Sequence, residues 1–131
     1  MNIPKIMLTG ATGFLGGAVL ARMLASGHVP LMLIRARTSA EGVERARASA
    51  RQFGVPAPLL ERINASHVLC GDFTDTESYA TDQRIDDVTS VINCAALATF
   101  AENPRLWPVN VEGTFKFAER MAQSRKLERF L

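Results

Sequence analysis

Residues 9–16, TGATGFLG, decide the fold because they place Gly10, Gly13 and Gly16 at intervals of three directly after an apolar run. Glycine costs conformational entropy, so this fixed interval between an apolar run and a helix-like segment indicates a backbone requirement. A dinucleotide-binding strand–turn–helix unit gives each glycine its own role, namely a tight turn, room for a pyrophosphate, and close packing of the helix on the strand. A glycine-rich turn without a ligand is the alternative, and the surrounding sequence decides between the two.

Apolar runs without alternation, at 3–9 and 29–35, flank this turn and its helix and are typical of parallel strands covered on both faces. Residues 14–24 between them carry apolar side chains at helical spacing, and Gly27 stands where such a helix ends. Further strands are predicted at 67–71 and 89–96, with a fifth beginning in 127–131. Helices are predicted at 39–53 and 108–124, with a short one at 59–63. The pattern predicts an α/β fold: a Rossmann-like, doubly wound parallel sheet of order 3-2-1-4, in one domain over 1–131.

Charge and hydropathy exclude several classes of function. The formal net charge is only +2 and basic residues are interleaved with acidic ones, so no nucleic-acid partner is expected. No segment approaches the roughly 18 apolar residues that a membrane span needs, and the first residues do not resemble a signal peptide. We therefore expect a cytoplasmic protein without a membrane partner.

Cysteine and histidine positions predict no disulfide and no metal site. Cys70 and Cys94 end strands three and four, which the predicted order separates by three strand spacings, roughly 14 Å. A disulfide requires Cα atoms within about 7 Å. His28 and His67 have no second ligand near them in the sequence, so structural roles are expected for both.

Other charged and aromatic residues predict structural roles. Glu41 precedes Arg45 by four residues on the second helix, which favours a solvated helix face over a binding patch. Trp107 is expected to pack against a helix start. Solvation is the main role expected for the carboxylates of Asp72, Asp75, Glu77, Asp86 and Asp87.

The residue after strand two separates NAD from NADP as the cofactor. NAD enzymes usually place an acid there, about 20 residues beyond the glycines, to bind the ribose hydroxyls. This chain has Arg35, nineteen residues after Gly16, followed by Arg37. An arginine can pair with the 2′-phosphate of NADP, whereas an acid would repel it. The sequence therefore predicts NADP over NAD, with solvated loop arginines as the alternative.

Four signatures in order make the chain resemble the extended short-chain dehydrogenase/reductase family. They are TGATGFLG at 9–16, GDF at 71–73, INCAA at 92–96 and NVEGT at 110–114, and together they span essentially the whole chain. The helix after LIRARTS, the GDFTD run and the phrase NCAALATF are most similar to the acyl-reducing branch, which includes thioester reductases and fatty acyl-CoA reductases. Sugar-nucleotide epimerases and dehydratases are the alternative within the family.

The resemblance implies a cofactor role for each signature. Residues 12–16 wrap the pyrophosphate, the two arginines lie by the adenosine ribose, and residues 72–73 flank the adenine. Residues 95–97 line the cofactor, and the asparagine of NVEGT helps to order the active site. The implied cofactor-binding residues are Gly10, Thr12, Gly13, Phe14, Leu15, Gly16, Arg35, Arg37, Asp72, Phe73, Ala95, Ala96, Leu97 and Asn110.

Catalysis in the family uses a serine or threonine, a tyrosine, and a lysine four residues after the tyrosine. Tyr79 is the one tyrosine here and Gln83 stands four residues on, so no catalytic residue is predicted. We expect the amino-terminal part of an NADP-dependent oxidoreductase, inactive alone, whose parent reduces a small-molecule substrate, a thioester-linked acyl group or a carbonyl. A non-catalytic dinucleotide-binding sensor is the alternative of another class.

The apolar strand at 89–96 has at most the start of a fifth strand beside it. An apolar edge of this kind invites pairing with another chain. The sequence therefore predicts self-association through strand four.

Overall fold

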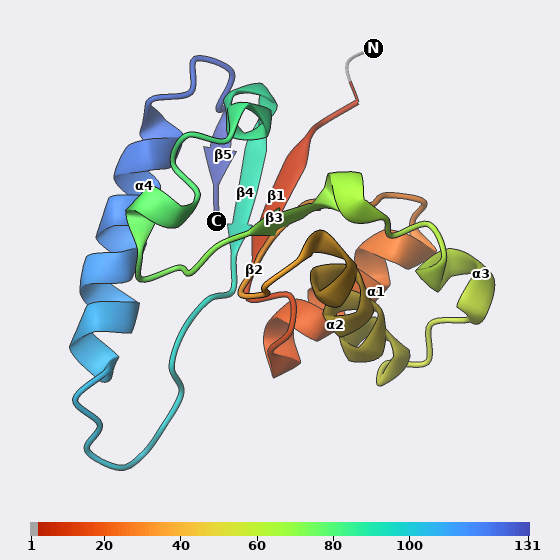
Figure 1. Ribbon diagram of the computed structural model, residues 1–131, viewed down its shortest axis with the longest axis horizontal. Coiled ribbons are helices and arrows are strands. Elements are labelled where there is room, and N and C mark those ends of the chain that lie inside the picture. Colours follow the sequence, from red (N-terminus) through yellow and green to blue (C-terminus); the bar gives the residue numbers. More distant parts are fainter. Residues whose placement is uncertain (1–2) are drawn as a thin grey trace.

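A parallel five-stranded sheet forms the centre of the computed structural model, which describes residues 3–131 (Figure 1). The order is β3-β2-β1-β4-β5, so the predicted Rossmann-like fold, the order 3-2-1-4 and the start of a fifth strand within 127–131 are confirmed. All pairs are parallel, and Met7 of β1 aligns with Leu31 of β2 and Val91 of β4. The strands are β1 Ile6–Thr9, β2 Leu31–Ile34, β3 Val68–Cys70, β4 Ser90–Asn93 and β5 Arg129–Phe130.

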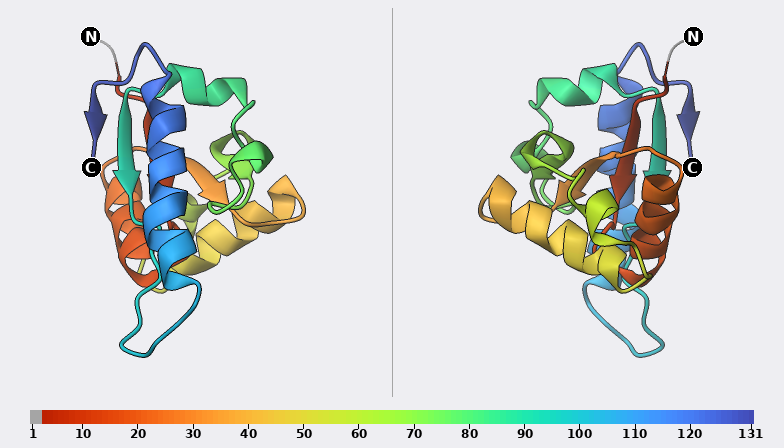
Figure 2. Two further views of the ribbon diagram at one scale, coloured as in Figure 1. Left: turned by 90° about the vertical axis from the view of Figure 1, so that its left-hand side faces the viewer. Right: turned by 90° about the vertical axis from the view of Figure 1, so that its right-hand side faces the viewer.

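Helices cover both faces of the sheet, as the views in Figure 2 show. Alternate strand residues point to opposite faces, so Leu8 and Met32 pack under α1 and α2, whereas Met7 and Leu33 pack under α4. The helices are α1 Phe14–Ala25, α2 Ser39–Arg51, α3 Ala57–Leu60 and α4 Thr114–Ala122, with 3₁₀ turns η1 Ala65–His67, η2 Thr76–Ser78 and η3 Gln83–Asp87. Two apolar cores, one on each face, hold the sheet between these layers.

Close packing of α1 on α2 fixes the start of α1 relative to the sheet. A Cβ added to Gly17 would lie 2.5 Å from the Ser49 Oγ, so the two helices meet here without room for a side chain. The same hydroxyl donates a buried 2.8 Å hydrogen bond to the carbonyl of Ala11, in the turn before α1. The second helix therefore supports the turn that precedes the first.

The helix predicted at 108–124 begins differently from the expectation. Residues Pro108–Gly113 form a π-helix, η4, and α4 follows as an α-helix that ends at Ala122. Pro108 has no N–H to donate to the preceding turn, which removes one helical hydrogen bond where the wider turn begins. The expected packing of Trp107 is wrong, since its residue is 64% exposed.

Strand β5 changes the expectation for the sheet edge. Ser90 aligns with Arg129 and Val91 with Phe130. Beyond that pair, the Asn93 N–H donates to the carbonyl of Leu131 at 2.7 Å. The prediction that strand four lacks a neighbour is therefore wrong, and the free edge belongs to β5.

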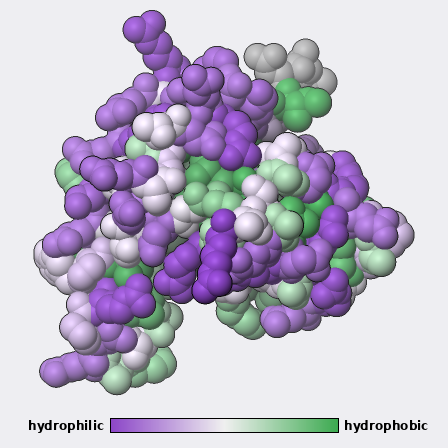
Figure 3. All heavy atoms as spheres, in the orientation of Figure 1, coloured by the Kyte–Doolittle hydropathy of each residue, from purple (hydrophilic) through white to green (hydrophobic). Residues whose placement is uncertain are grey.

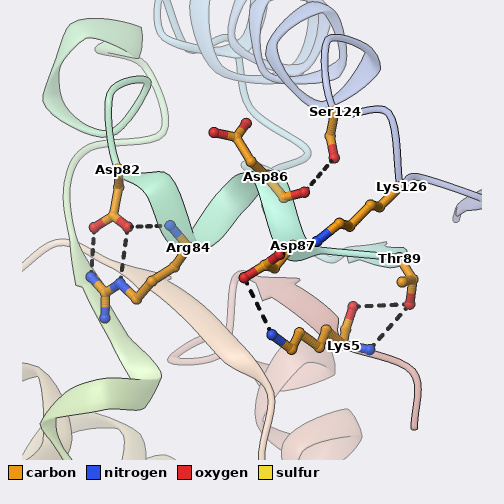
Figure 4. Close-up of polar contacts among 8 residues, drawn as sticks. All are labelled: Lys5, Asp82, Arg84, Asp86, Asp87, Thr89, Ser124 and Lys126. Carbon is orange, nitrogen blue, oxygen red and sulfur yellow. Dashed lines mark hydrogen bonds and ion pairs between the residues drawn. The ribbon is translucent and has the colours of Figure 1, made fainter. Parts of the chain in front are cut away.

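Carboxylates of η3 make ion pairs, so the expectation of mere solvation is wrong for Asp86 and Asp87. Asp86 accepts a 3.0 Å hydrogen bond from the guanidinium of Arg120 in α4. Asp87 pairs with Lys5 at 3.3 Å and with Lys126, which brings the start of β1 and the segment after α4 together (Figure 4). These two lysines hold the pKa of the Asp87 carboxyl below its ordinary value.

Cys70 at the end of β3 and Cys94 after β4 are both free, and β2 and β1 lie between their strands. His67 has a structural role, because its Nδ1 accepts the N–H of Asn64 at 3.1 Å and caps η1. Within residues 3–131, no cluster of three or more His, Cys, Asp or Glu residues could hold a metal ion. No helix in that range has the length and hydropathy to cross a bilayer.

Candidate dinucleotide-binding cleft

The turn between β1 and α1 requires glycine at two positions. Gly10 has a φ of +71°, and a Cβ there would lie 2.6 Å from the backbone carbonyl of Cys94. A Cβ on Gly16 would lie 1.8 Å from the Gly10 carbonyl oxygen, so the first turn of the helix sits directly on the turn before it. Both glycines therefore serve the close approach of backbone segments to one another.

Gly13 differs from its neighbours because the space beside it is open. An added Cβ would have only one contact within 4 Å, the Gly10 oxygen at 3.4 Å. Gly13 is also the residue before α1, and it provides no side-chain cap for the N–H groups of the first helical turn. Those N–H groups and the positive end of the helix dipole favour an anion at this place. The turn thus has the shape and the polarity that a pyrophosphate requires.

A cleft of about 290 Å³ extends from this turn across the carboxyl ends of the strands. Figure 3 shows a hydrophobic patch in the middle of the view, between α4 and the α1–α2 side, with hydrophilic residues around it. Of the predicted cofactor residues, the cleft is lined by Gly10, Thr12, Gly13, Arg35, Asp72, Phe73, Ala95 and Ala96. These residues come from four segments that are far apart in the sequence.

The remaining predicted residues do not line the cleft. Phe14 and Leu15 are 86% and 63% exposed, and the Phe14 ring lies edge-on to Phe53 at a centroid distance of 5.6 Å. Gly16 is buried under Gly10. Arg37 is exposed, and its N–H donates to the Glu41 carboxylate at 3.1 Å at the start of α2.

Asn110 and Leu97 form the support of one wall. The Leu97 N–H donates to the Asn110 Oδ1 at 2.7 Å, and the Asn110 Nδ2 donates back to the Leu97 carbonyl at 3.0 Å. This two-way contact ties the loop after β4 to η4. Asn110 therefore orders the wall of the cleft from behind instead of entering it.

Thr9, at the end of β1, orders the same wall from the other side. Its buried hydroxyl donates to Asn93 Oδ1 and accepts the N–H of Ala95 at 3.2 Å. The Cys94 N–H also donates to the Thr9 carbonyl at 3.2 Å. These bonds hold the backbone after β4 against the glycine turn.

Asp72 presents a charged carboxylate at the far end of the cleft. Its Oδ1 accepts the N–H of Thr74 at 2.9 Å and the Thr74 hydroxyl at 2.7 Å. Those bonds hold the pKa of the Asp72 carboxyl below its ordinary value, and the charges of Arg35 and Arg105 lower it further. The carboxylate is therefore ionised at neutral pH.

The sequence predicted a solvated helix face at Arg45, but in the structure this residue of α2 contacts other parts of the chain. Its guanidinium reaches across to donate to the carbonyl of Arg35, and it lines the cleft. Elsewhere on α2, Arg47 forms an ion pair with Glu44 at 3.2 Å.

Four further lining residues were not singled out from the sequence: Leu33, Thr74, Arg105 and Val109. Thr74 follows the GDF signature directly, and its hydroxyl two residues after Asp72 is a signal for a local turn. Arg105 has no such signal, because its place depends on the path of the loop after β4, which Figures 1 and 2 show extending beyond the sheet.

A larger cavity of about 470 Å³ lies at the opposite, amino-terminal ends of the strands. The charged residues on its wall include Lys5 and Asp87, which neutralise each other as an ion pair. The glycine on its wall, Gly27, follows the end of α1, so this cavity lies at the carboxyl end of that helix and not at its start. The carboxyl-terminal cleft is therefore the candidate site.

Comparisons with known proteins agree with this geometry. Residues 8–131 match the model of an NAD-binding family described as "Male sterility protein". The chain is 31% identical over 136 residues to the L-2-aminoadipate reductase large subunit of Penicillium chrysogenum, a match that covers 97% of this chain and 9% of that protein.

Two solved structures of reductase domains have the same fold. One is the terminal R domain from the myxalamid PKS-NRPS biosynthetic pathway, with 25% identity, a TM-score of 0.75, and coverage of 99% of this chain and 35% of that one. The other is the PhqB reductase domain from Penicillium fellutanum, with 26% identity, a TM-score of 0.73, and coverage of 97% and 35%. The chain spans about a third of these reductase domains. Because the family match covers almost the whole sequence and the signatures surround the cleft, the chain belongs to the male sterility protein family of the extended short-chain dehydrogenases/reductases.

Proposed function

We propose that the cleft binds NADP(H) for a reductase that transfers hydride to a thioester-linked acyl group or a carbonyl. The observation that carries the proposal is the open space beside Gly13, at the uncapped start of α1. Arg35 and Asp72 line the same cleft. A pyrophosphate fits the open space beside Gly13, and an adenosine fits the part of the cleft at Arg35 and Asp72.

The preference for NADP follows from the charges at the end of β2. The first residue after β2 is Arg35, in the place where a carboxylate would bind the ribose hydroxyls of NAD. Asp72 does not take the place of that carboxylate, because it follows β3 and not β2. A phosphate on the ribose finds a cation in this position, which favours NADP.

The residues of this chain would bind and orient the cofactor. The N–H groups at the start of α1 would hold the pyrophosphate, and Thr9 and Asn110 keep the loop after β4 in place beside that position. When bound, the nicotinamide supplies the hydride of the reaction. The remaining parts of the chemistry need groups that this chain does not place in the cleft.

The class of substrate is inferred from the relatives. The L-2-aminoadipate reductase subunit and the two reductase domains are reductases, which favours an acyl-reducing parent over the sugar-nucleotide epimerases and dehydratases. The proposed substrate is a small molecule or a carrier-bound acyl group. The free Cys70 and Cys94 agree with the reducing conditions of the cytoplasm, where we place the protein.

A dinucleotide-binding sensor is the second candidate. Tyr79, the one tyrosine, is only 1% exposed and packs edge-on against Phe117 in the core under α4. Burial raises the pKa of its hydroxyl, the opposite of what a general acid at neutral pH needs. A serine and a tyrosine-x-x-x-lysine sequence in a longer reading frame would support the reductase, and their absence from that frame would support the sensor.

Calorimetry with the two nucleotides tests the proposal. NADPH and NADH are titrated into the protein, into Arg35→Ala, and into Arg125→Ala as a control at an exposed arginine in the turn after α4. We expect Arg35→Ala to weaken NADPH by about ten-fold or more with little effect on NADH. An unchanged NADPH/NADH ratio would contradict the assignment of the 2′-phosphate site.

We propose separately that the protein self-associates through the edge of β5, instead of through strand four as the sequence predicted. The edge is two residues long, and Phe130 and Leu131 beside it are 38% and 75% exposed. Light scattering over a range of concentrations tests it: a mass that rises with concentration is expected, and a strictly monomeric mass would contradict it.

A further inference from the structure

Arg105 enters the cleft from a segment that the sequence signatures do not mark. It precedes η4, and it lines the same cleft as Arg35, which follows β2 seventy residues earlier. Its backbone is held in place, because its N–H donates to Asn103 Oδ1 at 2.9 Å and its carbonyl accepts the Val109 N–H at 3.0 Å. The exposed side chain is thus presented from a fixed position on the wall opposite β2.

Charge around the cleft is unbalanced. Its lining includes three arginines (Arg35, Arg45 and Arg105) and one carboxylate (Asp72), a formal charge of +2. The whole chain also carries +2, so the rest of the sequence is neutral and the net excess is concentrated at this site. A concentration of one sign of charge in a cleft attracts a ligand of the opposite sign.

Two of these cations have no partner within residues 3–131. The Arg45 guanidinium donates to a backbone carbonyl, and the Asp72 carboxylate is bonded to Thr74. The guanidinium groups of Arg35 and Arg105 make neither a hydrogen bond nor an ion pair with any described residue. Both are therefore available to a ligand without losing an existing contact.

The position of Arg105 along the cleft is at the adenosine end. Its charge and that of Arg35 both act on the Asp72 carboxylate. Asp72 follows β3, which β2 separates from β1 and from the turn at the start of α1. Phe73, next to Asp72, packs against the η4–α4 element that Arg105 precedes, with a 5.4 Å ring-centroid distance to Phe117. This contact brings the loop end at residue 105 close to the segment after β3.

We propose that Arg105 is a second recognition arginine for the phosphate on the adenosine ribose, facing Arg35 across the cleft. The inference rests on the proposed NADP(H) function and adds a specificity-determining residue to it. A ribose phosphate has three free oxygens, and one guanidinium pairs with two of them at most, so a second guanidinium completes the recognition. Because the two arginines come from opposite walls, the phosphate would also join those walls.

The experiment uses two half-molecules that differ only in the phosphate at issue, adenosine 2′,5′-bisphosphate and 5′-AMP. Each is titrated by calorimetry into the 131-residue protein, Arg105→Gln, Arg105→Lys, and the control Arg125→Gln. The Arg105 side chain is exposed and makes no hydrogen bond or ion pair with a described residue, so neither substitution should disturb folding. NADPH is titrated in parallel as the complete ligand.

We expect Arg105→Gln to weaken the bisphosphate by about ten-fold or more and to leave 5′-AMP within about two-fold. Arg105→Lys keeps the charge but loses the paired donors. Its affinity for the bisphosphate should therefore lie between those of the unmodified protein and Arg105→Gln. Equal weakening of both probes would overturn the inference and place Arg105 on a shared part of the ligand. No weakening of either probe would overturn it as well.

Failure of the inference and failure of the proposed function give different results. If NADPH binding depends on Arg35 but not on Arg105, only the inference is wrong. If the unmodified protein binds neither NADPH nor NADH, the proposed function is wrong and the inference falls with it.

Discussion

Alanine at Gly13 and at Gly16 should separate the ligand-binding role of the turn from its packing role. A Cβ at Gly16 would start 1.8 Å from the Gly10 oxygen and 2.4 Å from its carbonyl carbon. Side chains do not approach closer than 3.0 Å, so α1 would have to move by about 1.2 Å, the difference between 3.0 and 1.8 Å. The obstacle is backbone, which cannot rotate away as a side chain can. We therefore expect Gly16→Ala to lower the free energy of unfolding by about 3 kcal/mol.

Gly13→Ala should leave the fold intact and impair the site. Its Cβ would meet only the Gly10 oxygen, at an ordinary 3.4 Å, and its φ is not in the left-handed region. The change in helix capping and the loss of unfolded-state entropy oppose each other, so stability should stay within about 1 kcal/mol. The added methyl group occupies the space that a pyrophosphate would use. NADPH affinity should fall by about ten-fold or more as charge-assisted hydrogen bonds are lost.

Urea unfolding followed by circular dichroism measures the free energy of unfolding, and calorimetry measures the affinity for NADPH. The two variants should change different quantities, Gly16→Ala mainly stability and Gly13→Ala mainly affinity. A Gly16→Ala protein with an unchanged urea midpoint would refute the close contact between helix and turn. A Gly13→Ala protein that binds NADPH normally would refute the pyrophosphate site.

Three smaller predictions concern the supports of the site. Arg120→Ala removes two hydrogen bonds of a nearly buried guanidinium that ties α4 to the η2–η3 segment, and should cost about 2 kcal/mol in urea unfolding. Asn110→Leu frees the loop after β4, so exchange of the Leu97 amide proton should quicken about five-fold or more by NMR. Thr74→Val should raise the pKa of Asp72 toward its ordinary value in a carboxyl NMR titration. The pKa of Asp72 is lower in the folded protein than in the unfolded chain. Its contribution to stability is therefore present above the pKa of the unfolded chain and is lost as the pH falls through the pKa of the folded protein. The stability difference between the two proteins should therefore shrink in acid.

The sequence predicted best where the cause is local. Gly10 has a positive φ and Gly16 sits against the Gly10 carbonyl, both within one strand–turn–helix unit, so their spacing identified the turn. The apolar runs around it predicted four strands in the correct order. The helix at 39–51 likewise follows from its own composition and from the Thr38 cap.

Features that depend on contacts between distant segments were not predictable in this way. Arg45 occupies a helical surface position by spacing alone, and only the close return of the chain after β2 puts the Arg35 carbonyl within its reach. Arg105 depends on a loop without repeating pattern, and Asp87 depends on two lysines from opposite ends of the chain. The start of a fifth strand was predicted at 127–131, but its pairing with β4 was not.

The central claim is that the uncapped first turn of α1 receives a pyrophosphate, and NMR titration of the backbone amides tests it most directly. Addition of NADPH to the ¹⁵N-labelled protein should shift the amide signals of residues 12–16 most strongly, with those of residues 94–97 beside them. Signals from the cavity at the amino ends of the strands should stay in place. Unshifted amides in residues 12–16 at saturating nucleotide, or shifts confined to the opposite cavity, would contradict the account.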